Sequence, residues 1–369
     1  MQRRCAARPA IWLRLTTQQP DNLKHPFIKN HFNKRKVVYF MKKAPYEVPE
    51  SKRIRVIIDT DCACEADDQY AVAHQLMTPK FDVRGINAAH FNTMMGMTTV
   101  AASAQKSFEE AQRVVDLMGL HDQVKVHHGC ADVLPDEHTP VDSEASRFII
   151  EEAMRDDERP LFVTVQGAIT NVASAYLMEP KIADRMTVIW IGGGVYPAGD
   201  WEFNACNDLN AANVIMESPI ELWQVPKNVY SMMKVSFATL YDKVWPCGEI
   251  GKYIVEYMTK TVNMGIMGNP DPATREMMKK LRPKDMSEGA ARCTYPGGES
   301  WQVGDSPVVG LMLTDHEGHY TVEGAPRFAK NGTYLLRPSN PRKIRVYNYV
   351  DNHFILEDFF AKIKYYFGD

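Results

Sequence analysis

Short apolar runs alternate with helix-like segments along most of the chain after residue 51. The apolar runs predict strands at residues 53–58, 83–89, 124–126, 161–166, 187–191 and 221–225. Between them, apolar residues spaced three or four apart predict helices at residues 71–76, 98–118, 143–155, 169–177 and 209–216. This alternation predicts an α/β fold with an open, mostly parallel, Rossmann-like sheet, because right-handed crossovers place helices on both of its faces.

The pattern after residue 226 is less regular. Residues 226–300 are rich in Met, Gly and Pro, and we expect helices and loops there that cap one end of the sheet. Strand signals return at residues 308–313 and 344–347. An amphipathic helix with apolar residues at Phe354, Ile355, Phe359 and Phe360 is predicted to end the chain and to dock on the core.

Charge divides the chain into two parts. Residues 1–43 hold eleven Lys or Arg residues against the single acid Asp21, although the whole chain has a net charge of −3. We therefore predict a basic, flexible extension at residues 1–50 and one catalytic domain at residues 51–369. An organellar transit peptide and a nucleic-acid-binding arm are the alternatives for the extension. No aromatic residues are regularly interleaved with its basic ones, so no nucleic-acid partner is expected.

The amino-acid composition indicates which class of protein this is and in which compartment it is expected. With 45% hydrophobic and 24% charged residues, the chain has an ordinary globular composition. No run of about 18 apolar residues is present, so we expect no membrane insertion. The seven cysteines are scattered without a C-x-x-C pair, which argues against a disulfide framework and a structural zinc site. A reducing, cytoplasmic location is the expectation.

Acidic residues concentrate where the first predicted strand ends. Residues 59–68 read D-T-D-C-A-C-E-A-D-D, which places four aspartates and Glu65 at a strand-to-helix turn. Carboxylates that converge there repel one another, and a hard divalent cation with oxygen ligands resolves the repulsion. Helix capping accounts for Asp67 and Asp68 alone. Binding of a soft metal by Cys62 and Cys64 is the minor alternative, because the surrounding groups are all oxygen.

Other polar groups follow later strands, where an open parallel sheet binds its ligands. His90 and Asn92 follow the second strand, and the segment Q-G-A-I-T-N follows the strand at 161–166. A triple glycine at 192–194 precedes the triplet Glu202-Phe203-Asn204, and Asp305 is an isolated acid further on. Each has a simple structural explanation, but their joint position at strand ends indicates one site.

These motifs resemble those of the inosine-uridine-preferring nucleoside hydrolase family, over most of residues 53–320. That family contains calcium-dependent enzymes that hydrolyse the N-glycosidic bond of ribonucleosides. Its signature D-x-D-x-x-x-D-D is similar to the run from Asp59 to Asp68, which has two extra residues in its loop. Its E-F-N triplet is present unchanged at residues 202–204.

The resemblance implies roles for individual residues. Asp61 would bind calcium and act as the base on the attacking water. The other calcium ligands would be Asp68, Asp305 and the backbone carbonyl of Gln166, which stands at the first position of the family's T-G-x-L-T-N segment. The ribose would be held by Asp67, Asn92, Glu202 and Asn204. The resemblance also implies a small-molecule nucleoside substrate, the products ribose and free base, and a homo-oligomer, either a dimer or a tetramer.

The chain departs from the family at the leaving group. Purine-protonating members carry His immediately before the distal Asp, where this chain has Gly304. Activation of the leaving base must therefore differ. We take His90 as the candidate acid and Trp301 as the candidate stacking partner, and His316, His319 and Trp201 are alternatives. In the longer acidic loop, Glu65 can replace one of the aspartate ligands.

Two other functions compete with hydrolysis of nucleosides. A haloacid-dehalogenase-like phosphohydrolase would use Asp59 and Asp61, but Ala63 does not fit its motif and the E-F-N triplet would have no use. A non-catalytic ribosyl- or carbohydrate-binding member of the same fold is the second alternative, and retention of the acidic residues favours catalysis over it. The sequence leaves open whether the substrate is a nucleoside, nicotinamide riboside or another ribosyl compound.

Overall fold

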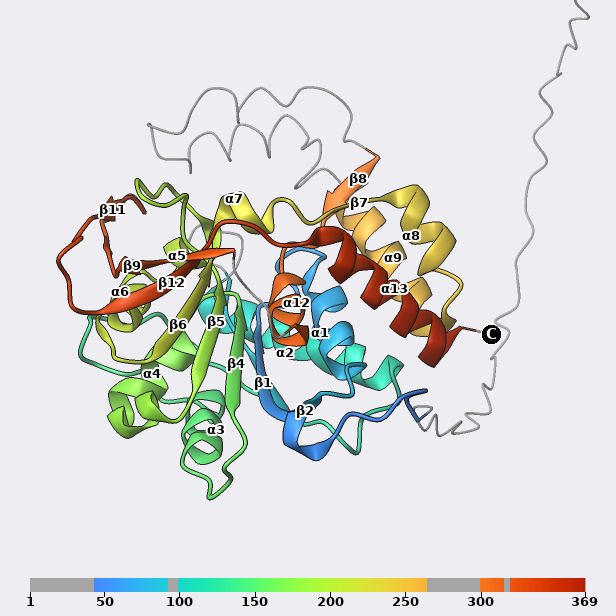
Figure 1. The fold of residues 1–369 in the computed structure, drawn as a ribbon, viewed down its shortest axis with the longest axis horizontal. Helices are drawn as coiled ribbons and strands as arrows, with labels where there is room; N and C mark the ends of the chain where they lie inside the picture. The colour runs from blue at the N-terminus through green and yellow to red at the C-terminus, as the bar shows by residue number, and fades with distance from the viewer. Residues whose placement is uncertain (1–42, 92–98, 264–298, 315–318, 369) are drawn as a thin grey trace, which may run out of the picture. The chain divides into compact units, whose positions relative to one another are not determined.

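A mixed sheet forms the centre of the described part of the protein (Figure 1). The computed structural model describes residues 43–91, 99–263, 299–314 and 319–368, which all belong to one unit of the chain, Tyr39–Asp369. The eight strands have the order β3-β2-β1-β4-β5-β6-β12-β9. Their bounds are β1 Ile54–Thr60, β2 Phe81–Ala88, β3 Val126–His127, β4 Leu161–Gln166, β5 Thr187–Ile191, β6 Glu221–Val225, β9 Tyr320–Gly324 and β12 Lys343–Tyr347.

Every neighbouring pair in this sheet is parallel except β12 and β9. The predicted open, mostly parallel α/β sheet is therefore confirmed. Three predicted strands, at residues 161–166, 187–191 and 221–225, have the bounds of β4, β5 and β6. These strands lie inside the sheet, where both faces are covered and the apolar run is continuous.

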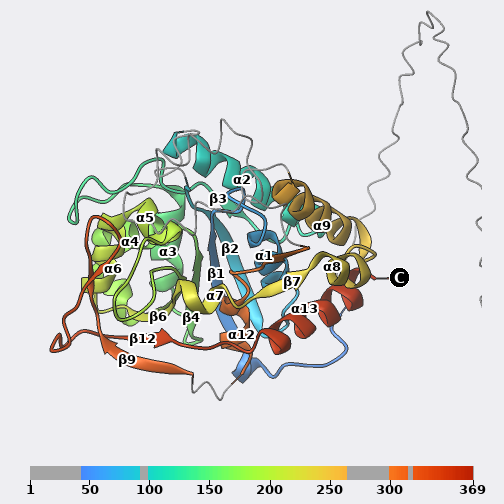
Figure 2. The same cartoon turned by 90° about the horizontal axis from the view of Figure 1, so that it is seen from above.

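Helices cover both faces of the sheet (Figures 1 and 2). The longer ones are α1 Asp68–Leu76, α2 Val100–Leu117, α3 Glu144–Ala153, α4 Thr170–Met178, α6 Leu209–Glu217, α9 Gly248–Asn263 and α13 Asn352–Phe367. Short helices are α5 Phe203–Asn207, α7 Lys227–Tyr230, α8 Phe237–Lys243 and α12 Pro307–Leu313, with 3-10 turns at Glu50–Lys52 and Pro180–Asp184. The remaining strands form two small pairs, β7 Lys234–Ser236 with β8 Ser300–Gln302 and β10 Arg327–Phe328 with β11 Tyr334–Leu335.

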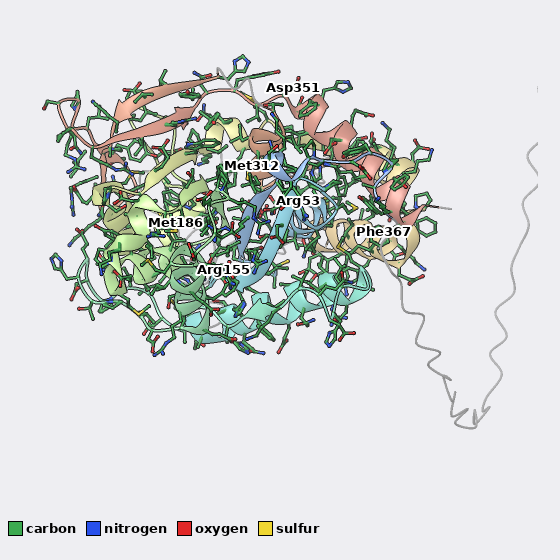
Figure 3. The ribbon with its side chains drawn as sticks, turned by 60° about the horizontal axis from the view of Figure 1, so that its bottom comes forward. Arg53, Arg155, Met186, Met312, Asp351 and Phe367 are labelled. Carbon is green, nitrogen blue, oxygen red and sulfur yellow. The ribbon has the colours of Figure 1, made fainter. Side chains whose placement is uncertain are left out.

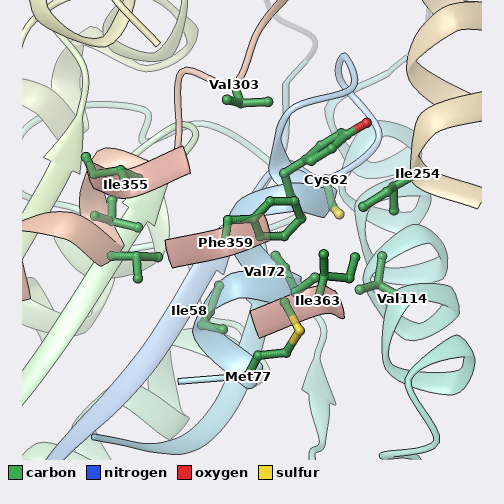
Figure 4. Packing of buried hydrophobic residues seen from close by; sticks show 14 of the residues in the cluster. Ile58, Cys62, Val72, Met77, Val114, Ile254, Val303, Ile355, Phe359 and Ile363 are labelled. Carbon is green, nitrogen blue, oxygen red and sulfur yellow. The ribbon is translucent and has the colours of Figure 1, made fainter. Parts of the chain in front are cut away.

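Alternation along β1 divides the core into two clusters. Val56 and Ile58 pack in one cluster with α1, α2, α9, α12 and α13, and Ile57 packs in the other with α3, α4 and α6. Successive side chains of a strand point to opposite faces, so a central strand contributes to both clusters. Figure 4 shows the first cluster, in which Phe359 and Ile363 of α13 lie close to Val72 and Met77 of the α1 region.

The predicted C-terminal helix is confirmed as α13. Phe359 and Phe360 are buried, so they dock this helix on the core as expected, whereas Phe354 is 40% exposed. The predicted capping region at 226–300 is represented by α7, α8, α9 and the β7–β8 pair. Residues 264–298 of that region lie outside the described residues.

The predicted strand at 308–313 is wrong, because these residues form the helix α12. Pro307 occupies its first turn, where a missing N–H costs nothing. The residues of α12 from Pro307 to Met312 are all buried. A short apolar run that is buried all round has no periodicity that separates a strand from a helix.

The edge of the sheet also differs from the prediction. β9 was not predicted, because it is an edge strand whose residues are mostly exposed or half-buried without alternation, and Val322 is 60% exposed. The short strand predicted at 124–126 begins two residues later, as β3. Arg53 and Met186, which directly precede β1 and β5, are labelled in Figure 3 and mark the edge where these strands begin. No helix among the described residues is long and apolar enough to cross a membrane.

A substitution at Gly310 tests the close approach of α12 and α13. A Cβ atom on Gly310 would stand 2.4 Å from Cγ1 of the buried Ile355. We expect Gly310→Ala to lower the free energy of unfolding by about 1–2 kcal/mol, because this overpacking exceeds the ~1 kcal/mol that alanine gains in a helix. In an Ile355→Ala background the same substitution should be neutral or stabilising. Chemical denaturation of the four proteins measures this, and stabilisation in both backgrounds would contradict the packing described here.

Candidate functional site

The site is built at the carboxyl ends of the central strands. Thr60, the last residue of β1, is in register with Ala88 of β2 and with Gln166 of β4. Asp61 and Gly167 directly follow β1 and β4, so they lie side by side at the ends of these neighbouring strands. A Cβ atom on Gly167 would stand 2.9 Å from Cβ and Cγ of Asp61. Glycine is therefore needed at 167 because the Asp61 side chain occupies that space.

Three buried aspartates meet at this edge of the sheet. Asp67, Asp68 and Asp305 each offer a ligand atom, and these atoms all lie within 4.8 Å of one another. Asp67 and Asp68 begin α1, and Asp305 lies just before α12. The backbone N–H of Gly304 donates to Oδ2 of Asp67 at 2.9 Å, which ties the two segments together. The Thr60 hydroxyl donates to Oδ1 of Asp68.

Asp61 belongs to the same group of acids. It is 3% exposed, and its Oδ2 has no hydrogen-bond partner among the described residues. Burial raises the pKa of Asp61 well above its ordinary value, and the charges of Asp68 and Asp67 raise it further. Burial and the neighbouring carboxylates act in the same way on the pKa values of Asp68 and Asp305. Such a group is stabilised by a cation that compensates the repulsion.

The donor set fits a hard divalent cation. The buried carboxylates supply oxygen ligands, and the unpartnered oxygen of Asp61 remains to be satisfied. Glu65, in the longer loop, lies close enough to share a hydrogen bond with Asp67. Burial raises the pKa values of the Cys62 and Cys64 thiols. Among the described residues, the ligand atoms that lie within 4.8 Å of one another are all carboxylate oxygens, which does not favour a soft metal.

Glu202 organises the other side of the site. It is the N-cap of α5, and Oε2 accepts the N–H groups of Gly193 at 2.7 Å and Ala205 at 2.9 Å. Oε1 accepts the N–H of Asn204 at 3.1 Å and the hydroxyl of Tyr230 at 2.9 Å. The triple glycine is thereby fixed to the E-F-N triplet, with Gly193 at a φ of +85° that favours glycine.

A comparison with known families identifies the chain. The family model described as "Inosine-uridine preferring nucleoside hydrolase" matches residues 56–352. The chain belongs to this nucleoside hydrolase family. The resemblance of the D-x-D and E-F-N motifs is thus confirmed at the level of the family.

Curated relatives in the nucleoside hydrolase family match part of the chain. The inosine-uridine preferring nucleoside hydrolase of Leishmania major is 28% identical over 176 residues, which are 39% of this chain and 55% of that protein. The pyrimidine-specific ribonucleoside hydrolase RihB of Escherichia coli O1:K1 is 29% identical over 135 residues, 34% of this chain and 43% of that protein. The chain spans about half the length of the curated relatives it matches.

Solved structures of nucleoside hydrolases share the fold. A purine-preferring ribonucleoside hydrolase from Gardnerella vaginalis has a TM-score of 0.61 at 16% identity, covering 85% of this chain and 99% of that chain. A plant nucleoside hydrolase has a TM-score of 0.59 at 18% identity, covering 84% and 98%. At these identities the likeness concerns the fold alone, and it confirms the predicted nucleoside hydrolase fold.

The structure brings some of the predicted site residues together. Asp61, Asp67, Asp68 and Asp305 form the acidic group, and the last residue of β4, Gln166, is aligned with Thr60 beside it. On the Glu202 side, Asn204 donates from Nδ2 to the carbonyl of Ile191 at 2.9 Å. Asn92 lies outside the described residues.

His90, the candidate acid, is buried and makes a hydrogen bond within the protein. Its Nε2 lies 2.8 Å from Oγ1 of Thr170, which itself donates to Oδ2 of Asp208 at 2.8 Å. The hydroxyl proton of Thr170 is used, so Nε2 of His90 is the donor. Burial lowers the pKa of His90 to about 4, and the imidazole is neutral at pH 7. The one N–H of this neutral ring is already donated to Thr170, so it does not point to a leaving base in this arrangement.

The other candidates for activating the leaving base lie in different parts of the fold. Trp301 lies on β8 opposite Val235 of β7 and is partly buried. Trp201 has the ammonium of Lys227 5.9 Å from its ring centroid. His319 is exposed and contacts the ring of Tyr349, with centroids 4.9 Å apart, and His316 lies outside the described residues.

Sequence reasoning missed Tyr230. Its ring atom Cδ2 lies 3.1 Å from the point where a Cβ on Gly304 would stand, and its hydroxyl reaches Glu202. Tyr230 therefore contacts both sides of the site. The available signal was its place five residues after the carboxyl end of the strand 221–225.

Removing one carboxylate tests the cation site by stability alone. We expect Asp305→Asn to raise the unfolding temperature of the protein in chelator, because one of the repelling buried acids is gone. Added calcium should stabilise the wild type, by about 2.7 kcal/mol at a hundredfold excess over Kd, and should stabilise the variant much less. Thermal unfolding with and without calcium measures both effects.

The exposed acid Asp122 provides the matched control. Asp122→Asn should change neither the unfolding temperature in chelator nor the gain on adding calcium. A calcium-induced gain in Asp305→Asn as large as in the wild type would exclude Asp305 from the cation site.

Proposed function

We propose that this protein hydrolyses the N-glycosidic bond of ribonucleosides, or of related N-ribosyl compounds, to ribose and free base. The observation that carries the proposal is the convergence of three buried aspartates within 4.8 Å, with the unpartnered oxygen of Asp61 in the same acidic group. Membership of the nucleoside hydrolase family supports this reaction and argues against the phosphohydrolase alternative. The activity and substrates named for the relatives belong to those proteins.

The acidic group would hold one calcium ion through Asp61, Asp68, Asp305 and the backbone carbonyl of Gln166. When bound, the ion would supply positive charge that orients the ribose hydroxyls and the attacking water. Asp61 is the proposed base, since within the acidic group its Oδ2 is a buried carboxylate oxygen without a hydrogen-bond donor. A carboxylate in this position can accept the proton of the water as the oxygen attacks C1′.

The ribose is proposed to lie between the acidic group and the E-F-N triplet. Asp67, Glu202, Asn204 and Asn92 are the proposed contacts to its hydroxyls. Cleavage of the C1′–N bond develops positive charge on the sugar, and buried carboxylates stabilise this charge in the transition state. The backbone donors that fix Glu202 keep it in place before the substrate arrives, so little reorganisation accompanies the reaction.

Several expectations remain predictions. These are calcium as the particular ion, the preference for purine or pyrimidine bases, the dimeric or tetrameric assembly, and the division of the chain at residue 50. Stacking of the leaving base on Trp301 is likewise a proposal.

Ribose release tests the proposed function. We expect the wild type to release ribose from at least one of a panel of purine, pyrimidine and nicotinamide ribosides, and chelator should abolish the release. Asp61→Asn should lower turnover by about 10²–10⁴-fold with an unchanged circular dichroism spectrum, because the base is lost and the fold is kept. A reducing-sugar assay measures the product.

One control variant and one binding measurement complete this test. Asp122→Asn, at an exposed position away from the site, should retain full activity. Calorimetric binding of ribose without release from any riboside would favour the non-catalytic ribosyl-binding alternative over hydrolysis.

A further inference from the structure

Tyr230 is the side chain that joins the two sides of the candidate site. Its hydroxyl donates to Oε1 of Glu202 at 2.9 Å. Its ring lies 3.1 Å from the position of a Cβ on Gly304, and the N–H of Gly304 binds Asp67. The phenol thus stands between two of the acids that are proposed to hold the ribose.

Glu202 has no free acceptor site in this arrangement. An ionised carboxylate offers about four lone-pair sites, and four donors fill them here. Three of these are backbone N–H groups, held by the glycine turn and the first turn of α5. The fourth is the Tyr230 hydroxyl, the only one carried by a side chain that can rotate. A ribose hydroxyl that donates to Glu202 must therefore displace the phenol.

A displaced phenol needs a new acceptor. Burial and the charge of Glu202 raise the pKa of Tyr230 well above its ordinary value, so it remains a neutral O–H donor. A buried donor that loses its partner carries a desolvation cost until it finds another. In the proposed function Asp67 and Asp305 are assigned to substrate and cation, and the charge of Glu65 also acts on the phenol. A bound substrate is the acceptor that is newly available beside the hydroxyl.

We propose that Tyr230 is the leaving-group donor of this enzyme: ribose binding takes its acceptor on Glu202, and the released phenol then donates to the departing base. This inference rests on the proposed function. It gives Gly304 a role as well, because a Cβ at 304 would stand only 3.1 Å from Cδ2 of Tyr230 and would press on the ring. Recognition of the sugar and activation of the base would then be coupled through one hydroxyl group.

The chemistry balances without a further reactant. The C1′–N bond breaks and its electron pair goes to the base nitrogen, while a water oxygen bonds to C1′. Asp61 takes one proton of the water and later releases it to solvent, and the base anion takes one proton from solvent as the products leave. The Tyr230 hydroxyl stabilises the negative charge that develops on the base by donating a hydrogen bond, and it keeps its own proton.

Substrates with different leaving groups test this role. Inosine and uridine release poor leaving groups, whereas p-nitrophenyl β-D-ribofuranoside releases a stable anion that needs no donor. We expect Tyr230→Phe to lower kcat on the nucleosides by about 10²–10⁴-fold. The kcat on the nitrophenyl riboside should stay within about threefold. The Kd for ribose, measured by calorimetry, should be unchanged or lower, since Glu202 no longer has to release the phenol.

Tyr365→Phe is the matched control. It removes the hydroxyl of a tyrosine in α13, which donates to the backbone carbonyl of Lys43 at 2.8 Å. It should change none of the three measurements. An equal fall of kcat on all substrates, no fall on the nucleosides, or weaker ribose binding in Tyr230→Phe would overturn the donor role. A wild type that releases ribose from no riboside at all would instead refute the proposed function, and this inference with it.

Discussion

Repulsion among buried carboxylates is the constraint that shapes this site. Asp61, Asp67, Asp68 and Asp305 are withdrawn from water at one edge of a sheet, and burial alone disfavours their charged forms. A parallel sheet makes such crowding attainable, because it brings the ends of distant segments to one edge. The Gly304 amide and the Thr60 hydroxyl reduce this repulsion by donating hydrogen bonds to Asp67 and Asp68. The remaining carboxylate oxygens form a set that suits a divalent cation.

The two sides of the site are prepared in different ways. On the aspartate side, the described groups leave an oxygen of Asp61 without a hydrogen-bond donor, which is where the proposed cation would add a partner. On the Glu202 side, every carboxylate oxygen is already engaged by donors of the protein. Under the proposed function, a ligand of Glu202 would replace one of these donors, whereas a ligand of Asp61 would replace none. Tyr230 lies between the two sides, because its hydroxyl contacts Glu202 and its ring lies beside Gly304.

The sequence was most informative where one physical requirement dominates. Strands buried on both faces, such as β4 and β5, were predicted to the residue because their apolar runs are continuous and bounded by turns. The acidic group was predictable because so many carboxylates in one turn have few structural explanations. By contrast, α12 was mistaken for a strand, since complete burial erases periodicity, and the edge strand β9 has no apolar run. Tyr230 escaped notice because its importance depends on Glu202 and Gly304, which are distant in sequence and meet only after folding.

The close contact between Tyr230 and Gly304 also restricts how this site can change by single substitutions. A Cβ at 304 would stand 3.1 Å from Cδ2 of Tyr230 and 3.2 Å from Oδ2 of Asp67, so one of these groups would have to shift to admit a side chain such as histidine. Removal of the ring in turn takes a donor from Glu202. The two positions are therefore coupled, because the cost of a side chain at 304 depends on the residue at 230. A route toward an imidazole acid at 304 that removes the Tyr230 ring first passes through an intermediate with neither the phenol nor the imidazole.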